Sequence, residues 1–147
     1  AFSKEREQFG RPIAEFQGLQ WMLADMSVQL EAARALLHKA ALSAGHNGSP
    51  FPDATLAAQG KIFTSEMALK VTTDALQVFG ARGYSRNYPM ERLARDARMF
   101  TIGGGTAQIL RTVVASRILG SKLPQTRDGF TKLAELASAR TILQAAE

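Results

Sequence analysis

The sequence has 147 residues, 46% of them hydrophobic, and a formal net charge of +5. This hydrophobic content can build a core and excludes an intrinsically disordered chain, and no apolar run approaches the roughly 20 residues of a membrane span. Because the sequence holds no cysteine, disulfides, a thiolate nucleophile and a zinc-thiolate site are excluded. The composition predicts a globular domain without a membrane span.

Neither the net charge nor the histidines indicate a particular function. A net charge of +5 favours an anionic partner, such as nucleic acid, phosphates or anionic lipid, and fits an ordinary basic surface equally well. His38 and His46 have no acidic partner at ligand spacing. We expect both to be surface or helix-end residues, and no metal site is predicted.

The chain begins AFSKEREQFG, and residues 2–9 have the pattern of the last turns of a helix, stopped by Gly10 and Pro12. Since the sequence starts without methionine in what looks like the end of a helix, we expect it to be part of a longer protein. Any signal peptide would then lie upstream of Ala1, so its absence from the sequence says nothing about localisation.

Two long amphipathic helices are predicted next. The first starts near Phe16 and ends in the loop GHNGSPFPD; the second starts after Asp53, a good N-cap, and ends at Gly80. Apolar residues recur at steps of three and four on one face of each, which predicts two core stripes. The stripes are Leu19, Leu23, Met26, Leu30, Ala33 and Leu37, and then Leu56, Gly60, Phe63, Met67, Val71, Ala75 and Val78.

The second half of the chain predicts shorter helices. Pro89 suits the first turn of a helix through MERLARDAR, with Glu91 near its positive end. Three glycines, residues 103–105, interrupt the helical pattern before Thr106 caps a helix that ends at Gly120. Its predicted core stripe is Ile109, Leu110, Val113, Val114, Ile118 and Leu119, and a weaker final helix holds Phe130, Leu133, Leu136 and Ile142.

No segment shows the alternation of a strand, so long helices with short connections predict an all-α fold, an up-and-down four-helix bundle. We expect the bundle domain over residues 1–122, with its first helix truncated. Residues 123–147 are expected to form a C-terminal extension with a short amphipathic helix.

The three glycines fit neither the Walker pattern GxxxxGK[ST] nor the dinucleotide pattern GxGxxG between a strand and a helix. Two interpretations remain open. The glycines present bare N–H groups at a helix N-terminus, where anions or carbonyl oxygens bind, or they form a tight turn between helices.

Four ordered motifs resemble the C-terminal domain of the acyl-CoA dehydrogenases. They are RxxFGxPI at residues 6–13, QxFGxxGY at 77–84, PMERLxRDAR at 89–98 and IxxGTxQIxR at 102–111. The resemblance covers roughly residues 3–120, and we recognise no counterpart for the tail beyond Leu123.

The resemblance implies an FAD-dependent enzyme that converts an acyl-CoA thioester to the trans-2-enoyl-CoA. A carboxylate removes the α-proton and flavin accepts the β-hydride. The implied partners are an electron-transfer acceptor protein and further copies of the chain, as a dimer of dimers, and no nucleic acid. The compartment stays open: cytoplasmic if the source is bacterial, the mitochondrial matrix if it is eukaryotic.

The resemblance also implies contacts with FAD. Arg6 corresponds to an arginine that reaches the FAD pyrophosphate of a neighbouring subunit, and Phe9 to an aromatic residue beside the adenosine. The other implied FAD contacts are Gln8, Gln17, Gln77, Gly80, Ala81, Thr106 and Gln108. Ala81 replaces a glycine that is common in the family. Structural alternatives exist, such as dipole compensation for Arg6 and a helix cap for Thr106.

Gly104 stands where many family members carry the catalytic glutamate, and glycine cannot accept a proton. Relatives resembling the isovaleryl-CoA and long-chain dehydrogenases place that glutamate on the preceding helix. The base is then expected upstream of Ala1, and the chain alone is expected to be inactive. Gly104 and Gly105 are expected beside the acyl chain and the thioester.

Two alternatives stay open: a flavin monooxygenase-like relative that needs no α-carbon base, and a non-catalytic helical interaction domain. Within the RDAR signature, Asp96 is flanked by Arg95 and Arg98. We expect these three residues to form structural ion pairs.

Arg6, Gln77 and Gly80 correspond to residues that serve a neighbour's FAD, so the flavin-loaded intact protein is expected to be a homo-oligomer. Sedimentation velocity of the purified protein checks this, and a flavin-loaded monomer would contradict it.

Overall fold

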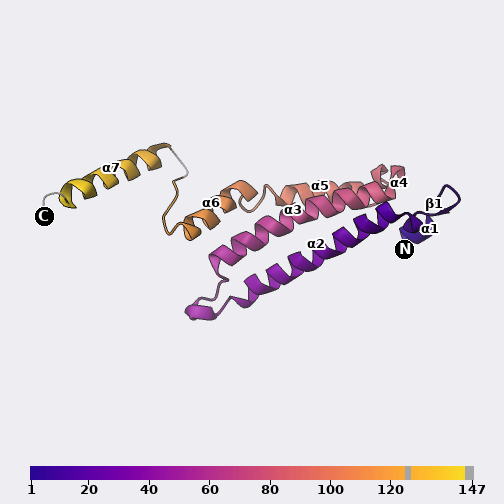
Figure 1. Ribbon diagram of the computed structural model, residues 1–147, viewed down its shortest axis with the longest axis horizontal. Coiled ribbons are helices and arrows are strands. Elements are labelled where there is room, and N and C mark those ends of the chain that lie inside the picture. Colours follow the sequence, from indigo (N-terminus) through magenta and orange to yellow (C-terminus); the bar gives the residue numbers. More distant parts are fainter. Residues whose placement is uncertain (125–126, 145–147) are drawn as a thin grey trace. The chain divides into compact units, whose positions relative to one another are not determined.

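The computed structural model describes residues 1–124 and 127–144 and shows the predicted all-α domain, with one small hairpin added (Figure 1). The N-terminal part holds α1 (Phe2–Glu5), β1 (Glu7–Gln8), β2 (Arg11–Pro12) and a 3-10 turn, η1 (Ile13–Glu15). There follow α2 (Gln17–Leu42), η2 (His46–Gly48), α3 (Ala54–Phe79), α4 (Ala81–Tyr84), α5 (Met90–Phe100), α6 (Ala107–Ile118) and α7 (Arg127–Gln144).

The chain divides into two compact units, Ala1–Val114 and Ala115–Glu147, and each is described by itself. The second unit holds the end of α6 and α7. Residues 125–126 and 145–147 of the predicted extension, and the side chain of Ile142 in its predicted helix, lie outside the described residues. The division into a bundle at 1–122 and an extension at 123–147 stays a prediction.

Both ends of α3 and the start of α6 have the capping residues that the sequence predicted. The Asp53 carboxylate accepts hydrogen bonds from the Thr55 and Leu56 amides at 3.0 and 2.9 Å. Gly80 ends α3 with a φ of +58°, a conformation that favours glycine. At α6 the Thr106 hydroxyl accepts from the Ile109 amide at 3.2 Å, as an N-cap does.

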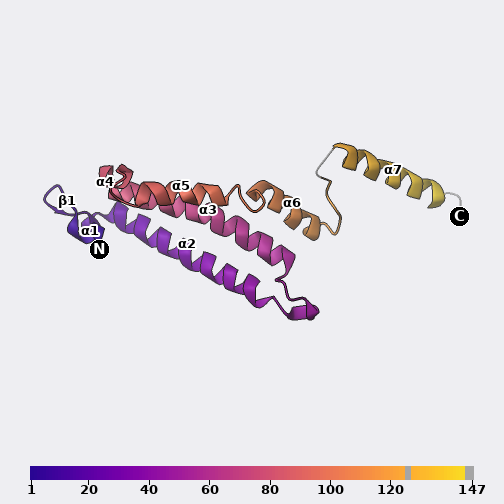
Figure 2. The same ribbon diagram turned by 180° about the vertical axis from the view of Figure 1, so that it is seen from behind.

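The helices α2 and α3 lie side by side along their length, and α5 lies along α3 (Figures 1 and 2). Small residues of these two helices, Ala33, Ala40 and Ala58, are buried. A Cβ on Gly60 would meet the side chains of Leu37 and Ala40 at 3.7 and 3.9 Å. The two helices therefore approach closely because little side chain separates them.

The main hydrophobic cluster lies where the N-terminal segment meets the end of α3. Ile13, Met26 and Val78 are buried there. Partly buried side chains surround them: Phe2, Phe16, Leu19, Met22, Val71 and Ala75. Through this cluster the core fixes the start of α2 and the C-terminal half of α3 to one another.

Parts of the predicted core stripes are exposed in this chain. On α2, Leu30 and Leu37 are 44% and 48% exposed, while Met26 and Ala33 of the same stripe are buried. A contact made by small residues covers a narrow strip, so the larger side chains beside it stay outside. The stripe prediction is also wrong for Leu23, Phe63, Ile109, Ile118 and Leu119, which are exposed. Phe130, Leu133 and Leu136 of the final helix are exposed as well.

Two predictions are wrong at the N-terminus: the helix over residues 2–9 and the absence of strands. The helix ends at Glu5 because Arg6 is extended, with φ −76° and ψ 124°. Antiparallel pairing then joins β1 to β2. Phe9 and Gly10 form the turn with φ values of 54° and 76°, and two positive angles are typical of a two-residue hairpin.

The ion pairs expected around Asp96 are also corrected. Arg95 pairs with Glu91 at 3.3 Å, one helical turn back. Side chains one or two positions apart on a helix point in different directions, whereas those four apart face each other. Among the described residues Asp96 has no ion pair with Arg95 or Arg98.

Gly83 provides a test of this packing. A Cβ there would lie 2.7 Å from both the Leu76 carbonyl oxygen and the Phe79 Cβ. We expect Gly83→Ala to destabilise the intact protein by about 1–3 kcal/mol, since the backbone must shift. Thermal and urea unfolding measure the loss.

Gly18→Ala is the matched control, because a Cβ on Gly18, in the first turn of α2, would meet no atom within 4 Å. This change should leave stability unchanged or raise it by up to about 1 kcal/mol. Equal effects of the two substitutions would contradict the steric explanation.

Candidate functional site

The hairpin presents an exposed aromatic residue on a constrained backbone. Phe9 is 92% exposed and has a φ of 54°, which is uncommon for an aromatic residue. Its ring meets that of Phe16 edge-on at 6.1 Å. A residue that gains little burial and occupies an unfavourable conformation is a candidate for binding.

Arg6 lies at the base of the same hairpin with its backbone fixed on both sides. Its amide donates to the Phe2 carbonyl and its carbonyl accepts from the Ile13 amide, both at 2.8 Å. The side chain is half-buried, and no ion pair within the described residues involves it. The guanidinium therefore remains available to an anionic ligand.

The end of α3 lies beside this N-terminal segment. Phe2 stacks on Phe79 with ring centroids 4.1 Å apart and planes inclined by 9°. This contact brings the segment that carries Arg6 to the end of α3 where Gln77 is exposed.

Gly80 and Ala81 follow at the same end of α3. The Gly80 amide donates to the Leu76 and Gln77 carbonyls, at 3.1 and 3.0 Å. Ala81 is the first residue of α4 and does not have a positive φ, so its methyl group costs no backbone strain. Gln8 and Gln17 are also exposed, on β1 and at the start of α2.

The three glycines form a tight turn between α5 and α6. The Gly103 amide donates to the Met99 carbonyl at 2.8 Å. Gly104 and Gly105 both have positive φ, 68° and 89°, and a Cβ on Gly104 would meet no atom within 4 Å. The loop thus combines the turn that the sequence allowed with open space beside Gly104. Whether it contacts a substrate stays a prediction.

A cleft of about 420 Å³ lies between α3, α5 and the start of α6. It includes Thr106, Gln108 and Arg98, which the sequence analysis named, and charged residues of α3, which it did not. The lining residues are Glu66, Leu69, Lys70, Thr73, Asp74, Arg98, Thr101, Ile102, Thr106, Ala107 and Gln108.

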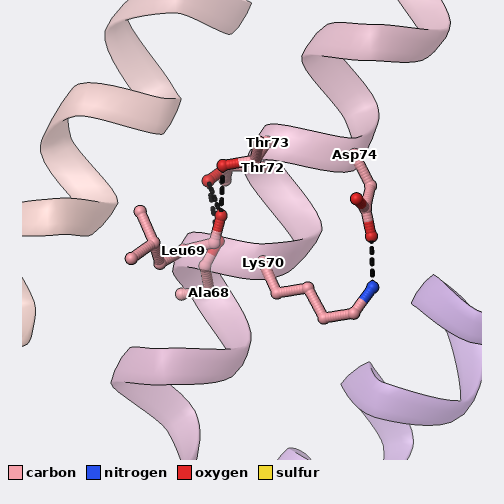
Figure 3. A network of polar contacts seen from close by, with 6 residues as sticks. All are labelled: Ala68, Leu69, Lys70, Thr72, Thr73 and Asp74. Carbon is pink, nitrogen blue, oxygen red and sulfur yellow. Dashed lines mark hydrogen bonds and ion pairs between the residues drawn. The ribbon is translucent and has the colours of Figure 1, made fainter.

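Lys70, Thr73 and Asp74 of the cleft belong to a network of polar contacts within α3 (Figure 3). The Lys70 ammonium donates to the Asp74 carboxylate at 2.6 Å, and this hydrogen bond raises the pKa of Lys70 above its usual value. The hydroxyls of Thr72 and Thr73 each donate to a backbone carbonyl four residues back at 2.7 Å. The spacing of Lys70 and Asp74, four residues apart on a helix, is the sequence signal that could have indicated this pair.

Two groups of predicted FAD contacts emerge, both in the first unit. One is at the end of α3, with Arg6 and Gln77; the other is at the cleft, with Thr106 and Gln108. Thr73 lines the cleft, and Gln77 lies one turn further along α3. The helix α3 therefore connects the two groups.

Within residues 1–124 and 127–144 there is no cluster of three or more His, Cys, Asp or Glu side chains that could hold a metal ion. Among these residues no helix is long and apolar enough to cross a membrane. His38 and His46 are exposed, as expected for surface residues.

Comparison with known proteins places these features in a family. The family model of the acyl-CoA dehydrogenase C-terminal domain matches residues 1–119. A 3-sulfinopropanoyl-CoA desulfinase of Advenella mimigardefordensis is 69% identical over 92% of this chain and 33% of its own. Three further proteins of that name are 67% to 69% identical.

Solved structures agree with the fold. Butyryl-CoA dehydrogenase of Megasphaera elsdenii is 43% identical, with a TM-score of 0.74 over 80% of this chain and 30% of that one. An FAD complex of the protein PigA is 28% identical, with a TM-score of 0.71 over 81% of this chain and 30% of that one.

The chain spans about one third of the length of the curated relatives that it matches. The match to the family covers α1 to α6, including the hairpin, the glycine loop and the cleft-forming helices α3, α5 and α6. The chain therefore belongs to the acyl-CoA dehydrogenase C-terminal domain family.

Proposed function

We propose that the chain is the C-terminal helical domain of an FAD-containing enzyme that removes sulfinate from a 3-sulfinoacyl-CoA thioester. The observation that carries the proposal is the identity of 67% to 69% with four proteins named 3-sulfinopropanoyl-CoA desulfinase, against 43% with butyryl-CoA dehydrogenase. Gly104, which leaves the glycine loop without a carboxylate, is compatible with it.

The chemistry of desulfination fits a loop without a base. Replacement of the sulfinate by hydrogen breaks the bond between sulfur and Cβ, and water supplies the atoms that convert the products to propanoyl-CoA and hydrogen sulfite. This equation balances without an oxidant or reductant, so no α-proton has to be lost overall. A glutamate at position 104 would also place a negative charge beside an anionic substrate, which costs binding energy.

The described residues fit FAD. Arg6 offers a pyrophosphate a guanidinium that forms no ion pair among the described residues. Phe9 offers an exposed ring for stacking, and nothing lies within 4 Å of a Cβ on Gly80, so a ligand can approach that backbone closely. When bound in a dehydrogenase of this family, the flavin accepts the hydride; the residues of this chain would hold and orient it.

Dehydrogenation of an acyl-CoA is the second candidate function. It is favoured by the 43% identity and TM-score of 0.74 with butyryl-CoA dehydrogenase. The base would then come from outside the described chain, because the loop that carries it in many relatives has glycine at position 104. An electron acceptor protein would be a partner in this case.

The two functions predict different products from the intact, flavin-loaded protein. With 3-sulfinopropanoyl-CoA we expect release of sulfite and propanoyl-CoA. A disulfide dye that reacts with sulfite detects the first product, and mass spectrometry detects the second. The absorbance spectrum of the flavin should still be that of the oxidised form after turnover. With butanoyl-CoA under anaerobic conditions we expect no bleaching. Bleaching by butanoyl-CoA without sulfite release from the sulfinate would establish the dehydrogenase instead.

Arg6→Ala in the intact protein should weaken FAD retention about 10- to 100-fold, because a charge-assisted hydrogen bond contributes about 1.5–3 kcal/mol. Flavin fluorescence during dilution and dialysis measures the change. Arg11→Ala is the control on the same hairpin, since the Arg11 guanidinium lies over the Phe16 ring at 4.2 Å and has no predicted FAD role. Equal loss of flavin in both variants would mean that only the hairpin fold matters.

Gly104→Glu tests whether the loop faces the α-carbon. The new side chain finds space but has to adopt a positive φ, so we expect a loss of about 1–2 kcal/mol in stability and reduced desulfination. We also expect slow anaerobic bleaching by butanoyl-CoA, because a carboxylate can now remove the α-proton. Gly104→Gln has the same backbone strain without a base and should not bleach. If neither variant bleaches, the loop does not lie beside the α-carbon.

A further inference from the structure

The side chain of Lys61, on α3, contacts the glycine loop, although Lys61 and Gly105 are 44 positions apart in the sequence. Its ammonium donates to the Gly105 carbonyl oxygen at 2.5 Å. None of the ion pairs within the described residues involves Lys61, and the small cleft that it lines with Thr64, Ser65, Ala68 and Phe100 contains no acid. The charge of Lys61 is therefore directed at the loop backbone.

The loop needs support from outside because its own sequence does not fix it. Local hydrogen bonds reach Gly103, whose amide is bound to Met99, and resume at Ala107, whose amide donates to the Thr101 carbonyl at 3.1 Å. Between them Gly104 and Gly105 have the largest conformational freedom of any residue type. Among the described residues, the hydrogen bond from Lys61 to the Gly105 carbonyl is the one that joins these two glycines to another helix.

The contact also sets the direction of the next amide. A trans peptide is planar, so its N–H points opposite to its C=O. Because the Gly105 carbonyl points to Lys61, the Thr106 N–H points away from that ammonium. In the described part of the chain no acceptor bonds to this N–H. A cation on the carbonyl polarises the peptide and makes the N–H a stronger donor.

We propose that Lys61 is a positioning residue, which holds the Gly105 carbonyl so that the backbone of residues 104–106 meets the acyl-CoA thioester in one conformation. This inference rests on the proposed function, which places the loop beside the thioester. Lys61 itself does not touch the substrate; it acts through the peptide that it holds.

A purely structural tie is the competing explanation. The Glu66 carboxylate and the Arg111 guanidinium, 2.7 Å apart, already link α3 to α6 beyond the loop. This pair holds the helix, so loss of Lys61 should leave α6 in place and release the loop alone. If Lys61 positions the loop, its loss should weaken acyl-CoA binding while stability is unchanged. If Lys61 is only a structural tie, its loss should lower stability and leave binding unchanged.

The test compares Lys61→Met, which keeps the length of the side chain and removes the charge, with Lys61→Arg, which can still donate to the carbonyl. Both are made in the intact flavoprotein. Propanoyl-CoA is the probe, titrated while the absorbance spectrum of the bound flavin is recorded, and KM and kcat are measured with 3-sulfinopropanoyl-CoA. Lys39→Met, at an exposed position near the end of α2, is the matched control.

We expect Lys61→Met to retain flavin and to unfold within a few degrees of the control. Its kcat/KM should fall about 10- to 100-fold, as for loss of a hydrogen bond to a charged group, and the spectral change on binding propanoyl-CoA should shrink. Lys61→Arg should recover most of the kcat/KM and most of the spectral change on binding propanoyl-CoA. If Lys61→Met does not fold, a Lys61→Arg protein with wild-type kinetics and spectrum still supports the positioning role.

Wild-type kinetics and spectral response in a folded Lys61→Met protein would overturn the inference and leave the proposed function intact. A loss of stability without any change in these readouts would overturn it as well, as would a folded Lys61→Arg protein with the same defect as Lys61→Met. If the wild-type flavoprotein itself neither binds propanoyl-CoA nor releases sulfite, the proposed function fails, and the positioning role fails with it.

Discussion

The close packing of α2 against α3 is the contact on which the rest of the first unit depends. Alanines and Gly60 let the two helices approach, and α3 then serves as a common support. The N-terminal segment stacks on its end through Phe79, α5 packs along it, and Lys61 and Glu66 bind the loop and α6. A shift of α3 would therefore disturb both groups of predicted cofactor contacts and the glycine loop together.

Glycine has three distinct physical uses in this domain. At Gly60 it permits close approach of helices, and at Gly83 it avoids a clash with the backbone of the preceding turn. At Gly104 and Gly105 it permits positive φ, and the same property leaves the loop free to adopt other conformations. The first two uses serve stability, whereas the third needs an external contact such as that of Lys61.

The proposed chemistry shows how one scaffold can serve two reactions. Dehydrogenation needs a base next to the α-carbon, and desulfination, which is redox-neutral overall, has no such requirement. In relatives that carry the catalytic glutamate at this position, its replacement by glycine would remove the base and also a repulsive charge. The cofactor contacts predicted at the hairpin and at the end of α3 are compatible with either reaction, since they lie on other elements than the loop.

Local signals in the sequence determined the helices and the family. The caps at Asp53, Gly80 and Thr106 depend on residues within three or four positions, so they could be predicted without the fold. The four motifs identified the family, and Gly104 indicated the missing base.

Only the tertiary structure decided the features that join distant parts of the chain. The hairpin of two residues per strand is too short to show alternation, so its sequence looked like the end of a helix. Periodicity identified the apolar face of α2 but not the width of its contact, which depends on the side chains of α3. The bond from Lys61 to Gly105 and the cleft beside Lys70 and Asp74 arise because α3 lies next to α5 and the start of α6, and no local pattern encodes that arrangement.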